Sequence, residues 1–579
     1  MSKTIRRSRI AAAVVALALV AVPCTLVADP AFAAGGTVWV NPAWTGATPG
    51  TDPDAGGPAT NFGVDSFATI ATALAVLPSA VNLAAATYTE QVQFSSTVTV
   101  HGAGAGLSVI ANPGSLTAVH TLGAIVVVGS GANVTMTGVT ITGPGVTIPG
   151  PFNAGVLVVD GGVLDLRSST VTAIRDTPLG GTQTGSGVVV GTTAAQGGVS
   201  TGSLHLEDST ISDFQKTGVL VRSGSTATIL DNDIVGQGWQ CVIASNGIQL
   251  QGTGTVAFNR VTANTYYWCG AGVATSFAIG VFSPSGTVDI HDNAITGNEI
   301  GLYFSAGAGV LSTVTATNNT IVGLEDDPSG HVEADDSYGI ISAWAGPNLA
   351  IGGNAVSRHH YGMDLGGGGE TVTSNSVTAN VTGLQIDVNP IRLAGNSIIG
   401  NTAGAAGLGS GGPNWWGCNE GPTNAACDSA TGYLEADWLV LSLALPVCEV
   451  AVDAVIPATL SLATTNSGVV TVDAFVPPTE ITPITGTGVV PTPLSGFTTS
   501  GALAITLAGD IEGPATLQAQ AQNALVAAPG PNTGCPVRLT VLPAFLLATT
   551  GSDPLPLLLV AVVLAVAGLL ARRLSPRFD

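Results

Sequence analysis

The sequence has little charge, few basic side chains and few aromatic ones. Charged residues make up 9% of the 579 residues and aromatic residues 5%, and 15 lysines and arginines stand against 37 acidic residues, a formal net charge of −22. This excess of negative charge repels nucleic acids and other polyanions, so we expect no nucleic acid as a partner and favour divalent cations or neutral partners. No segment of the middle of the chain keeps a 3.6-residue apolar period long enough for a helix. The 77 glycines favour stacked tight turns over a helical enzyme.

A three-residue motif recurs through the middle of the chain: Asn, any residue, then Ile or Val. Its last two steps are both 21 residues and the earlier ones 26 to 35, which indicates one stacked unit with insertions tolerated at a fixed place. An Asn turned inward at every bend can bond its amide to the Asn one coil above, which satisfies buried polar groups. The predicted ladder is Asn232, Asn259, Asn293, Asn319, Asn354, Asn375 and Asn396, with Thr137, Ser169 and Ser209 at the equivalent point of earlier coils.

A glycine that opens a short apolar strand accompanies these asparagines. Runs such as residues 187–190 and 226–230 alternate or are β-branched, which favours strands. A typical coil covers residues 383–402: a strand (383–387), a turn, a strand (391–394), Asn396 at a bend, a strand (397–399), then a corner. The predicted fold class is therefore all-β, with a parallel β-helix over residues 34–447. The strand-opening glycines are Gly155, Gly187, Gly218, Gly247, Gly280, Gly301, Gly339, Gly362 and Gly383.

With these motifs the chain resembles the right-handed parallel β-helix proteins of the pectin-lyase-like superfamily, from roughly Gly35 to Val447. Residues 65–77 resemble the amphipathic segment that caps the N-terminal end of such a core, and residues 86–90 and 102–104 resemble a first coil. Asn414-Trp415-Trp416-Gly417 resembles a closing signature of surface β-helices, whose two tryptophans we expect to plug the last coil.

The N-terminus has the features of a secretory signal peptide. Arg6, Arg7 and Arg9 precede an apolar run over residues 10–22, and Ala31-Phe32-Ala33 offers a small-x-small cleavage site. Residues 1–33, with Cys24, are therefore predicted to be removed on secretion. Between Ala34 and Thr550 only eight basic residues then face 34 acidic ones.

The C-terminus, residues 546–579, combines a pentapeptide (547–551), an apolar span (555–571) and a basic tail. The span is near the short limit for a transmembrane helix, and the tail would stay cytoplasmic. This order resembles a Gram-positive sortase sorting signal, and Ala548 in place of proline resembles the preference of class E sortases of actinobacteria. The resemblance implies a sortase as partner, cleavage between Thr550 and Gly551, and anchoring to the cell wall. The alternative is a plain membrane anchor.

Six cysteines remain after signal removal, an even number in an oxidising compartment, with 15 possible pairings. Stacking selects among these pairings, because Cys241 and Cys269 lie in the same corner of adjacent coils. The predicted disulfides are Cys241–Cys269, Cys418–Cys427 across the closing loop, and Cys448–Cys535, which brackets the segment that follows. That segment, residues 448–545, loses the ladder and has short strands at 469–472, 503–507 and 516–521. We expect a β-sandwich stalk that resembles bacterial Ig-like domains of invasin type.

The long insertions fall after the Asn strand, so they are predicted to form one wall of loops along the solenoid. Aromatic rings in this wall can stack on the apolar faces of sugars, which makes extracellular carbohydrate the expected ligand. The predicted ligand-binding residues are Trp239, Tyr266, Tyr267, Trp268, His360 and Tyr361. The plainer interpretation is that these rings cover the Cys241–Cys269 disulfide.

An acidic loop in the same wall offers oxygen ligands for Ca²⁺, which takes six to eight of them. The candidate ligands are Glu325, Asp326, Asp327, Glu333, Asp335 and Asp336, and the alternative is a solvated insertion. Lyases of the resembled fold neutralise a uronate with Ca²⁺ and abstract a proton with a basic residue. That resemblance makes Asp335, Asp336, Arg358 and His359 the candidate catalytic residues, but the Gly-His-Gly and Arg-x-Lys segments of the fold's glycosidases are absent.

The sequence therefore predicts a secreted, cell-wall-anchored protein whose β-helix presents a loop face for binding carbohydrate or another surface ligand. The alternative is a Ca²⁺-dependent polysaccharide lyase or other carbohydrate-active enzyme that acts on extracellular glycans.

Overall fold

The computed structural model describes residues 35–143, 153–266, 275–307, 309–323, 337–387, 392–468, 476–528 and 538–542, with Thr533 and Cys535. The predicted signal peptide (1–33) and sorting signal (546–579, with its helix at 555–571) lie outside these residues. Within the described part of the chain no helix is long and apolar enough to span a membrane.

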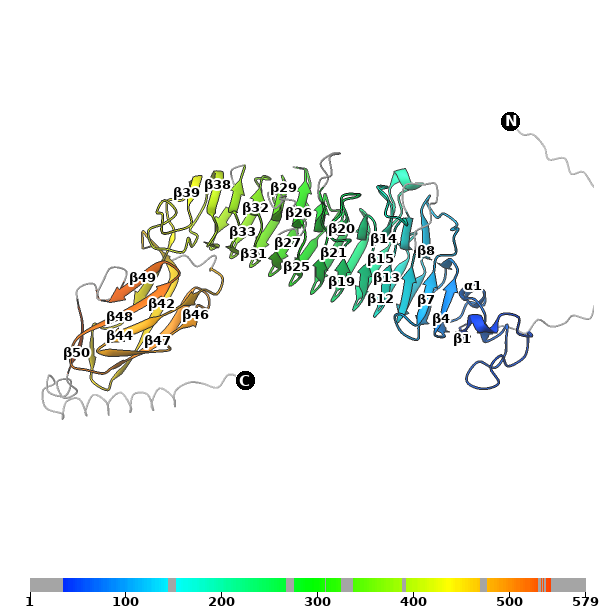
Figure 1. The fold of residues 1–579 in the computed structure, drawn as a ribbon, viewed down its shortest axis with the longest axis horizontal. Coiled ribbons are helices and arrows are strands. Elements are labelled where there is room, and N and C mark those ends of the chain that lie inside the picture. Colours follow the sequence, from blue (N-terminus) through cyan, green and yellow to red (C-terminus); the bar gives the residue numbers. More distant parts are fainter. Residues whose placement is uncertain are drawn as a thin grey trace, which may run out of the picture.

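Three parallel sheets wrap the chain into the predicted β-helix, which forms a long rod (Figure 1). Each coil runs through sheet C, sheet A and the short strands of sheet B before it returns to sheet C. Sheet A contains β2 (Ser66–Phe67), β1 (Thr37–Val40), β3 (Ala80–Leu83), β6 (Val98–His101), β9 (Asn133–Thr137), β12 (Val163–Arg167), β15 (Ser203–Glu207), β18 (Thr226–Leu230), β21 (Thr253–Ala257), β24 (Val288–His291), β27 (Val314–Thr317), β30 (Leu349–Gly352), β33 (Glu370–Thr373) and β36 (Arg392–Ala394). Sheet B contains β4 (Ala86–Thr89), β7 (Ser108–Ala111), β10 (Val139–Thr142), β13 (Thr170–Thr172), β16 (Thr210–Ser212), β19 (Asp233–Val235), β22 (Arg260–Thr262), β25 (Ala294–Thr296), β28 (Thr320–Val322), β31 (Ala355–Ser357), β34 (Ser376–Thr378) and β37 (Ser397–Ile399). Sheet C contains β5 (Val92–Phe94), β8 (Gly123–Val128), β11 (Asn153–Val158), β14 (Ser186–Val190), β17 (Thr217–Val221), β20 (Asn246–Leu250), β23 (Phe277–Phe282), β26 (Ile300–Ala306), β29 (Tyr338–Trp344), β32 (Tyr361–Leu365), β35 (Thr382–Ile386), β38 (Ala403–Ser410) and β39 (Ala430–Leu434).

The core consists of aliphatic side chains stacked coil upon coil. In β15, for example, Leu204 and Leu206 point inward and are buried, while His205 and Glu207 face outward. Parallel pairing in register places Leu204 against Leu164 of the preceding coil and Ala227 of the next, so each coil buries its apolar groups on its neighbours. The strand-opening glycines lie where coils approach closely: a Cβ on Gly218 would lie 2.6 Å from the Gly247 carbonyl oxygen. Gly280 was wrongly included, because Ala278 occupies that point in β23.

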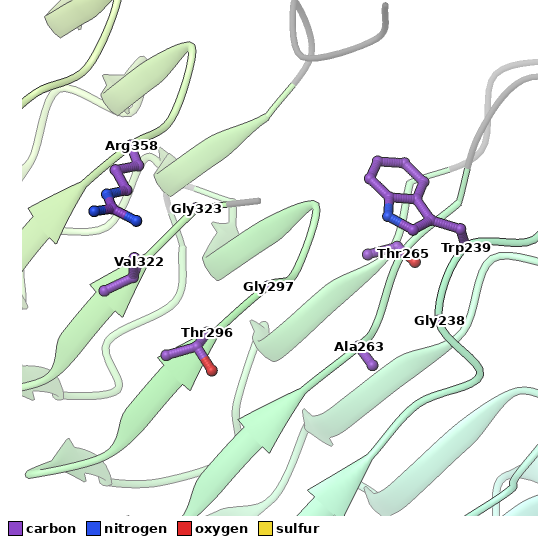
Figure 2. Close-up of a pocket in the computed structure, with 9 residues that line it drawn as sticks. All are labelled: Gly238, Trp239, Ala263, Thr265, Thr296, Gly297, Val322, Gly323 and Arg358. Atoms are coloured by element: carbon purple, nitrogen blue, oxygen red, sulfur yellow. The ribbon is translucent and has the colours of Figure 1, made fainter. Parts of the chain in front are cut away.

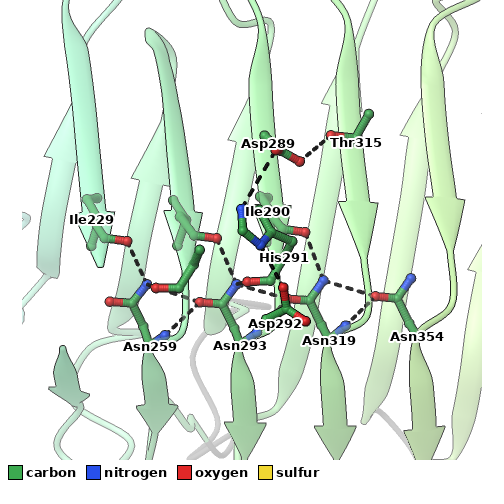
Figure 3. Close-up of polar contacts among 12 residues, drawn as sticks. Ile229, Asn259, Asp289, Ile290, His291, Asp292, Asn293, Thr315, Asn319 and Asn354 are labelled. Atoms are coloured by element: carbon green, nitrogen blue, oxygen red, sulfur yellow. Dashed lines mark hydrogen bonds and ion pairs between the residues drawn. The ribbon is translucent and has the colours of Figure 1, made fainter. Parts of the chain in front are cut away.

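The predicted asparagine ladder is confirmed between sheets A and B (Figure 3). Asn259 Nδ2 and its backbone N–H both donate to Asn293 Oδ1 at 3.0 Å, and Nδ2 also donates to the Ile229 carbonyl at 2.8 Å. The same pattern continues through Asn396 to Asn414, one residue more than predicted. Ser209 and Ser169 continue the ladder toward the N-terminus through their hydroxyls, as predicted.

Thr137 does not belong to this ladder, contrary to the prediction. It ends β9 and is half-buried, and the equivalent point is held by Val139, whose N–H donates to Ser169 Oγ. The error arises because the left-handed residue of this bend is Gly138, at φ 67°, so the ladder position falls on residue 139, two residues after Thr137.

The residue before each ladder member adopts the left-handed conformation that turns the chain through the bend. Asp231, Phe258, Asp292, Asn318 and Ser374 all have φ between 54° and 59°. Asp and Asn tolerate this region better than other non-glycine residues, because their short polar side chains can bond locally.

A second ladder, missed by the sequence analysis, lies between sheets B and C. Asn264 donates through N–H and Nδ2 to Asn298 Oδ1, and Asn380 does the same to Asn401 Oδ1. Each of these asparagines stands five residues after a member of the first ladder, whereas Phe214 and His359 stand at the equivalent point of two other described coils. The coils that contain these asparagines are therefore fixed by amide hydrogen bonds at both ends of their short strands.

At the N-terminal end, the observed helical cap is shorter than the predicted segment, residues 65–77. Helix α1 (Ile70–Leu74) is capped by the Thr69 hydroxyl, and Glu90 accepts from the N–H groups of Ile70 and Ala71 at 2.8 and 2.9 Å. Ile70 and Ala73 are buried against the first coil. Two 3₁₀ turns, η1 (Pro42–Trp44) and η2 (Ala194–Gln196), lie in connections.

A second, smaller β-domain follows the rod and has its own core. Its strands form two main sheets with a small two-stranded one, and its first strand begins at Leu439, before the predicted boundary at 448. The predicted strand at 469–472 lies outside the described residues, whereas those at 503–507 and 516–521 are found within β47 and β48. The sheets contain β40 (Leu439–Ala444), β42 (Val455–Thr465), β47 (Ala502–Gly509) and β45 (Val489–Thr492); β41 (Glu449–Ala451), β50 (Leu539–Leu542), β48 (Gly513–Ala521), β44 (Ile484–Thr487) and β49 (Ala524–Ala528); and β43 (Glu480–Ile481) with β46 (Gly496–Phe497).

Two of the predicted disulfides are present, Cys418–Cys427 and Cys448–Cys535. Cys241 is also disulfide-bonded. Its predicted partner, Cys269, lies outside the described residues, so that pairing stays a prediction.

Replacement of Asn319 by Ala tests the first ladder. The change leaves the Asn293 N–H and the Ile290 carbonyl without this partner in a buried site, so we expect the free energy of unfolding to fall by about 3 kcal/mol or more. Thermal or urea unfolding measures the loss. The matched control is Asn133→Ala, at an exposed strand position, which should change stability by less than ~0.5 kcal/mol. Equal losses in the two variants would contradict a special role for the ladder.

Candidate functional site

Long connections gather at the corner between sheets B and C, as predicted. They cover residues 173–185, 236–245, 263–276 and 323–337, each between a sheet B strand and the next sheet C strand. Three others depart from this rule, because residues 191–202, 307–313 and 411–429 follow sheet C strands. The corner therefore separates two surfaces: a groove on the sheet B side and the outer face of sheet C.

The groove crosses the turns of five consecutive coils and has a volume of ≈ 380 Å³ (Figure 2). At a strand spacing of ~4.8 Å, five coils correspond to a length of about 19 Å. Trp239 stands at one end and Arg358 at the other, with Thr296 and Val322 between them. Two residues predicted from the sequence, one as a sugar-stacking ring and one as a candidate catalytic base, thus line one groove. The full lining is Gly238, Trp239, Ala263, Thr265, Thr296, Gly297, Val322, Gly323 and Arg358.

The segment from Arg358 to Tyr361 turns the corner. Arg358 has φ 61° and lines the groove, the next residue faces the interior, and Tyr361 begins β32 on the sheet C side. One short segment therefore contributes to both surfaces.

His359 is a member of the second ladder, and its selection as a catalytic base was wrong. Its backbone N–H donates to Asn380 Oδ1 at 2.9 Å, and its side chain is 3% exposed. Burial lowers the pKa of this imidazole to about 3, so the ring stays neutral at every physiological pH. A ring held inside the core cannot reach a ligand on the surface. The sequence pattern could have revealed this, since His359 stands five residues after Asn354 just as Asn380 stands five after Asn375.

The outer face of sheet C has very little charge from β20 to β35, and most of its described side chains are half-buried. The six strands β20, β23, β26, β29, β32 and β35 contain one charged residue, Asp364. Half-buried tyrosines stand out from this face. The rings of Tyr338 and Tyr361, paired on adjacent strands, stack with centroids 5.1 Å apart and an angle of 15°. His360 lies against Tyr361 with centroids 4.5 Å apart.

A second group of aromatic rings lies on the same face, toward the N-terminus. Phe277, Phe282 and Tyr303 contact one another, with ring centroids between 5.2 and 6.1 Å apart. Of these, Phe277 is buried while Phe282 and Tyr303 keep part of their surface in solvent. The aromatic groups thus follow the rod over several coils.

Asp364 is the functional candidate that sequence reasoning missed. It pairs in register with Ile341 and Gln385 on the neighbouring strands, and within the described part of the chain no group donates a hydrogen bond to it. Burial first, and the charge of Asp387 second, raise its pKa to about 6. Asp387 in turn accepts from Gln385 Nε2 at 2.9 Å. A half-buried carboxyl without a protein partner is typical of a site that meets a ligand.

Several predicted residues lie outside the described residues. They include the whole acidic loop proposed for Ca²⁺ and the candidate acids within it, so these predictions stay open. Among described residues the only group with metal-ligand spacing is Cys418, Glu420 and Cys427, and both cysteines are in a disulfide. Tyr266 is described and half-buried just before the gap. The residues outside are Tyr267, Trp268, Glu325, Asp326, Asp327, Glu333, Asp335 and Asp336.

Comparisons with known proteins agree with the architecture. Residues 123–341 match the model of a family described as right handed beta helix region. Among solved structures, the chain is similar to the Dettilon tailspike protein (gp208), at 13% identity and a TM-score of 0.35, over 76% of this chain and 88% of that one. A similarity this low carries no argument about ligand or activity. No curated protein matched the sequence.

Asp364→Asn tests whether the ionised carboxyl of Asp364 destabilises the folded protein. A pKa of about 6, above the ordinary value of 3.8, means that the folded state loses stability as pH rises through that interval. The variant should therefore be more stable than the parent at pH 8, by ~1 kcal/mol after allowance for solvent screening, and equally stable below pH 4. Melting temperatures at the two pH values measure the difference. Asp231→Asn, at an exposed bend, is the control and should be neutral at both.

Proposed function

We propose that the protein is a cell-surface glycan-binding protein, and that its ligand lies along the corner between sheets B and C. The observation that carries the proposal is the stacked pair Tyr338 and Tyr361 on the outer face of sheet C, beside the unpaired carboxyl of Asp364. Aromatic rings offer broad apolar surfaces to the C–H faces of sugar rings, while carboxylates and amides accept or donate bonds to hydroxyl groups.

The charges on this face favour a neutral or amine-bearing glycan over a uronate. Asp364 and Asp387 are its acidic groups, and the strands that form it contribute no basic residue. The whole chain has a net charge of −22, which repels a polyanion at longer range. A sugar hydroxyl or ammonium group supplies the donor that Asp364 lacks.

The groove on the other side of the corner extends the contact. Trp239 offers a second stacking surface, Thr296 a hydroxyl, and Arg358 a cation, over about 19 Å at ~4.8 Å per coil. The ligand-facing residues predicted from the sequence, Trp239, His360 and Tyr361, all border this corner. An elongated site of this kind suits a chain of sugars better than a single one.

The cellular location of the protein is inferred from the sequence and is part of the proposal. The signal peptide directs secretion, and the Leu547–Gly551 pentapeptide with its hydrophobic span directs attachment to the wall of a Gram-positive cell by a class E-like sortase. The C-terminal β-domain, an Ig-like stalk, holds the β-helix away from the wall. This arrangement places the binding corner where extracellular glycans are met.

A glycan array tests the binding proposal. The parent chain should bind a neutral or amine-bearing polysaccharide and ignore polygalacturonate and alginate. Tyr361→Ala removes one ring of the stack and should weaken binding about 10-fold or more, the equivalent of ~1.4 kcal/mol. Phe258→Ala, an exposed ring on the bend between sheets A and B, is the control and should bind as the parent does. Binding to no glycan, or equal binding by all three proteins, would contradict the proposal.

A second candidate function, a carbohydrate-active enzyme, is favoured by one observation. The raised pKa of Asp364, about 6, next to Asp387 keeps a proton available near neutral pH, as a general acid requires. If the chain is a hydrolase, the bound polysaccharide should acquire new reducing ends, and Asp364→Asn should abolish them while binding persists. New ultraviolet-absorbing unsaturated ends would indicate a lyase instead.

A further inference from the structure

Three consecutive residues at the end of the rod belong to three different networks. Asn414 is the last amide of the first ladder and receives both donors of Asn396 on its Oδ1, at 2.9 and 3.1 Å. Trp415 is fully buried in the core of the C-terminal β-domain. Trp416 is fully buried in the core of the rod. The prediction that both tryptophans plug the last coil is thus right for Trp416 and wrong for Trp415.

Contacts around this segment join the two domains directly. Trp415 Nε1 donates to Gln522 Oε1 at 2.8 Å, across the boundary. Asn523 N–H donates to the Gly417 carbonyl at 2.9 Å, and its Nδ2 donates to the Ala426 carbonyl at 2.7 Å. On the rod side, the Trp415 backbone pairs with Ser397 of the last coil. The joint is therefore a hydrogen-bonded interface and not a flexible linker.

A single carboxyl group, that of Glu435, ends the first ladder at this joint. Its Oε1 accepts from the Asn414 N–H at 2.6 Å, and its Oε2 accepts from Asn414 Nδ2 at 3.2 Å and from Trp416 Nε1 at 3.0 Å. It thus holds the residues on both sides of Trp415. The second ladder ends on a carboxyl too, because Asp428 accepts from the N–H groups of Gly400 and Asn401 and from Asn401 Nδ2.

We propose that Glu435 is a pH-sensitive latch that sets how firmly the C-terminal domain is docked on the end of the rod. The latch acts on the segment from Asn414 to Gly417, which ends the rod and places Trp415 in the core of the C-terminal domain. Nothing in this role depends on the ligand-binding corner, which lies coils away along the rod (Figure 1).

The direction of the effect follows from the burial of the carboxyl. Burial raises the pKa of Glu435 to about 7, even though hydrogen bonds from Asn414, Trp416 and Tyr433 oppose the rise. Tyr433 is the titratable side chain that faces it, and burial with the charge of Glu435 raises the pKa of that phenol, so it stays neutral. Among described residues no arginine, lysine or histidine pairs with Glu435.

Because the folded pKa exceeds the ordinary value of 4.5, the folded joint binds a proton more tightly than the opened one. The docked state is accordingly most stable in acid, and it loses stability as pH rises through about 7. Above that pH a charge without a cationic partner is confined in the joint, so the segment opens more often.

Hydrogen exchange on the full-length chain tests the latch. Peptides that cover residues 412–420 and 520–525 are followed by mass spectrometry at pH 6.0 and 8.5, with rates corrected for intrinsic exchange. We expect protection in the parent chain to fall about 10-fold between the two pH values, as one pKa unit of linkage gives. In Glu435→Gln, which keeps the shape and cannot ionise, protection should change less than about 2-fold.

Asp428→Asn is the matched control, because it alters the end of the other ladder and leaves Glu435 in place. It should keep the pH dependence of the peptides around Trp415. The proposal is overturned if the parent shows equal protection at both pH values, if Glu435→Gln keeps the parent's pH dependence, or if Asp428→Asn abolishes it. Peptides from mid-rod strands, such as residues 288–291, report whether a variant has lost the fold as a whole.

Discussion

The amide-to-amide hydrogen bond between stacked asparagines is the interaction on which this structure depends. A bend that turns the backbone sharply leaves N–H and C=O groups pointing into a dry interior, where each unmet group costs about 1–3 kcal/mol. One asparagine per coil meets several of them at once: its oxygen takes two donors from the coil before, and its nitrogen reaches a carbonyl and the next amide. The aliphatic core can then stack in register, and the same register sets the positions of the side chains on the surface.

Much of the rod could be predicted because its regularities are local. The recurring Asn marks a bend, the glycine marks a close approach between coils, and both repeat once per coil, so the sequence alone revealed the strands, the ladder and the corner that carries insertions. The two disulfides that are present were predicted from their positions in the chain: Cys418–Cys427 lies across the closing loop, and Cys448–Cys535 brackets the segment that follows the rod. Where a different residue type stands in for the usual one, as Ala278 does for glycine or Val139 for asparagine, the pattern misled.

The candidate site was harder to predict, since its parts meet only through register. Tyr338 and Tyr361 are 23 residues apart and become neighbours because their strands pair. Asp364 has an unremarkable sequence context, and its raised pKa reflects burial and the carboxyl of Asp387, which directly follows the neighbouring strand β35. His359 looked like a surface group beside Arg358 and His360, yet the turn directs it inward. The assignment of Trp415 to a different core than Trp416 required knowledge of what packs beyond the last coil.

The left-handed bend at Arg358 has a consequence for how this surface can change. At the same point of other coils the chain has Ala263, Gly297, Ala379 or Gly400, small residues in the same backbone region. Any residue with a Cβ costs roughly 1–2 kcal/mol there that glycine would not. A glycine in place of Arg358 would therefore make the bend more stable and would also remove the positive charge from the groove, so backbone stability and a cationic contact oppose each other at this single position.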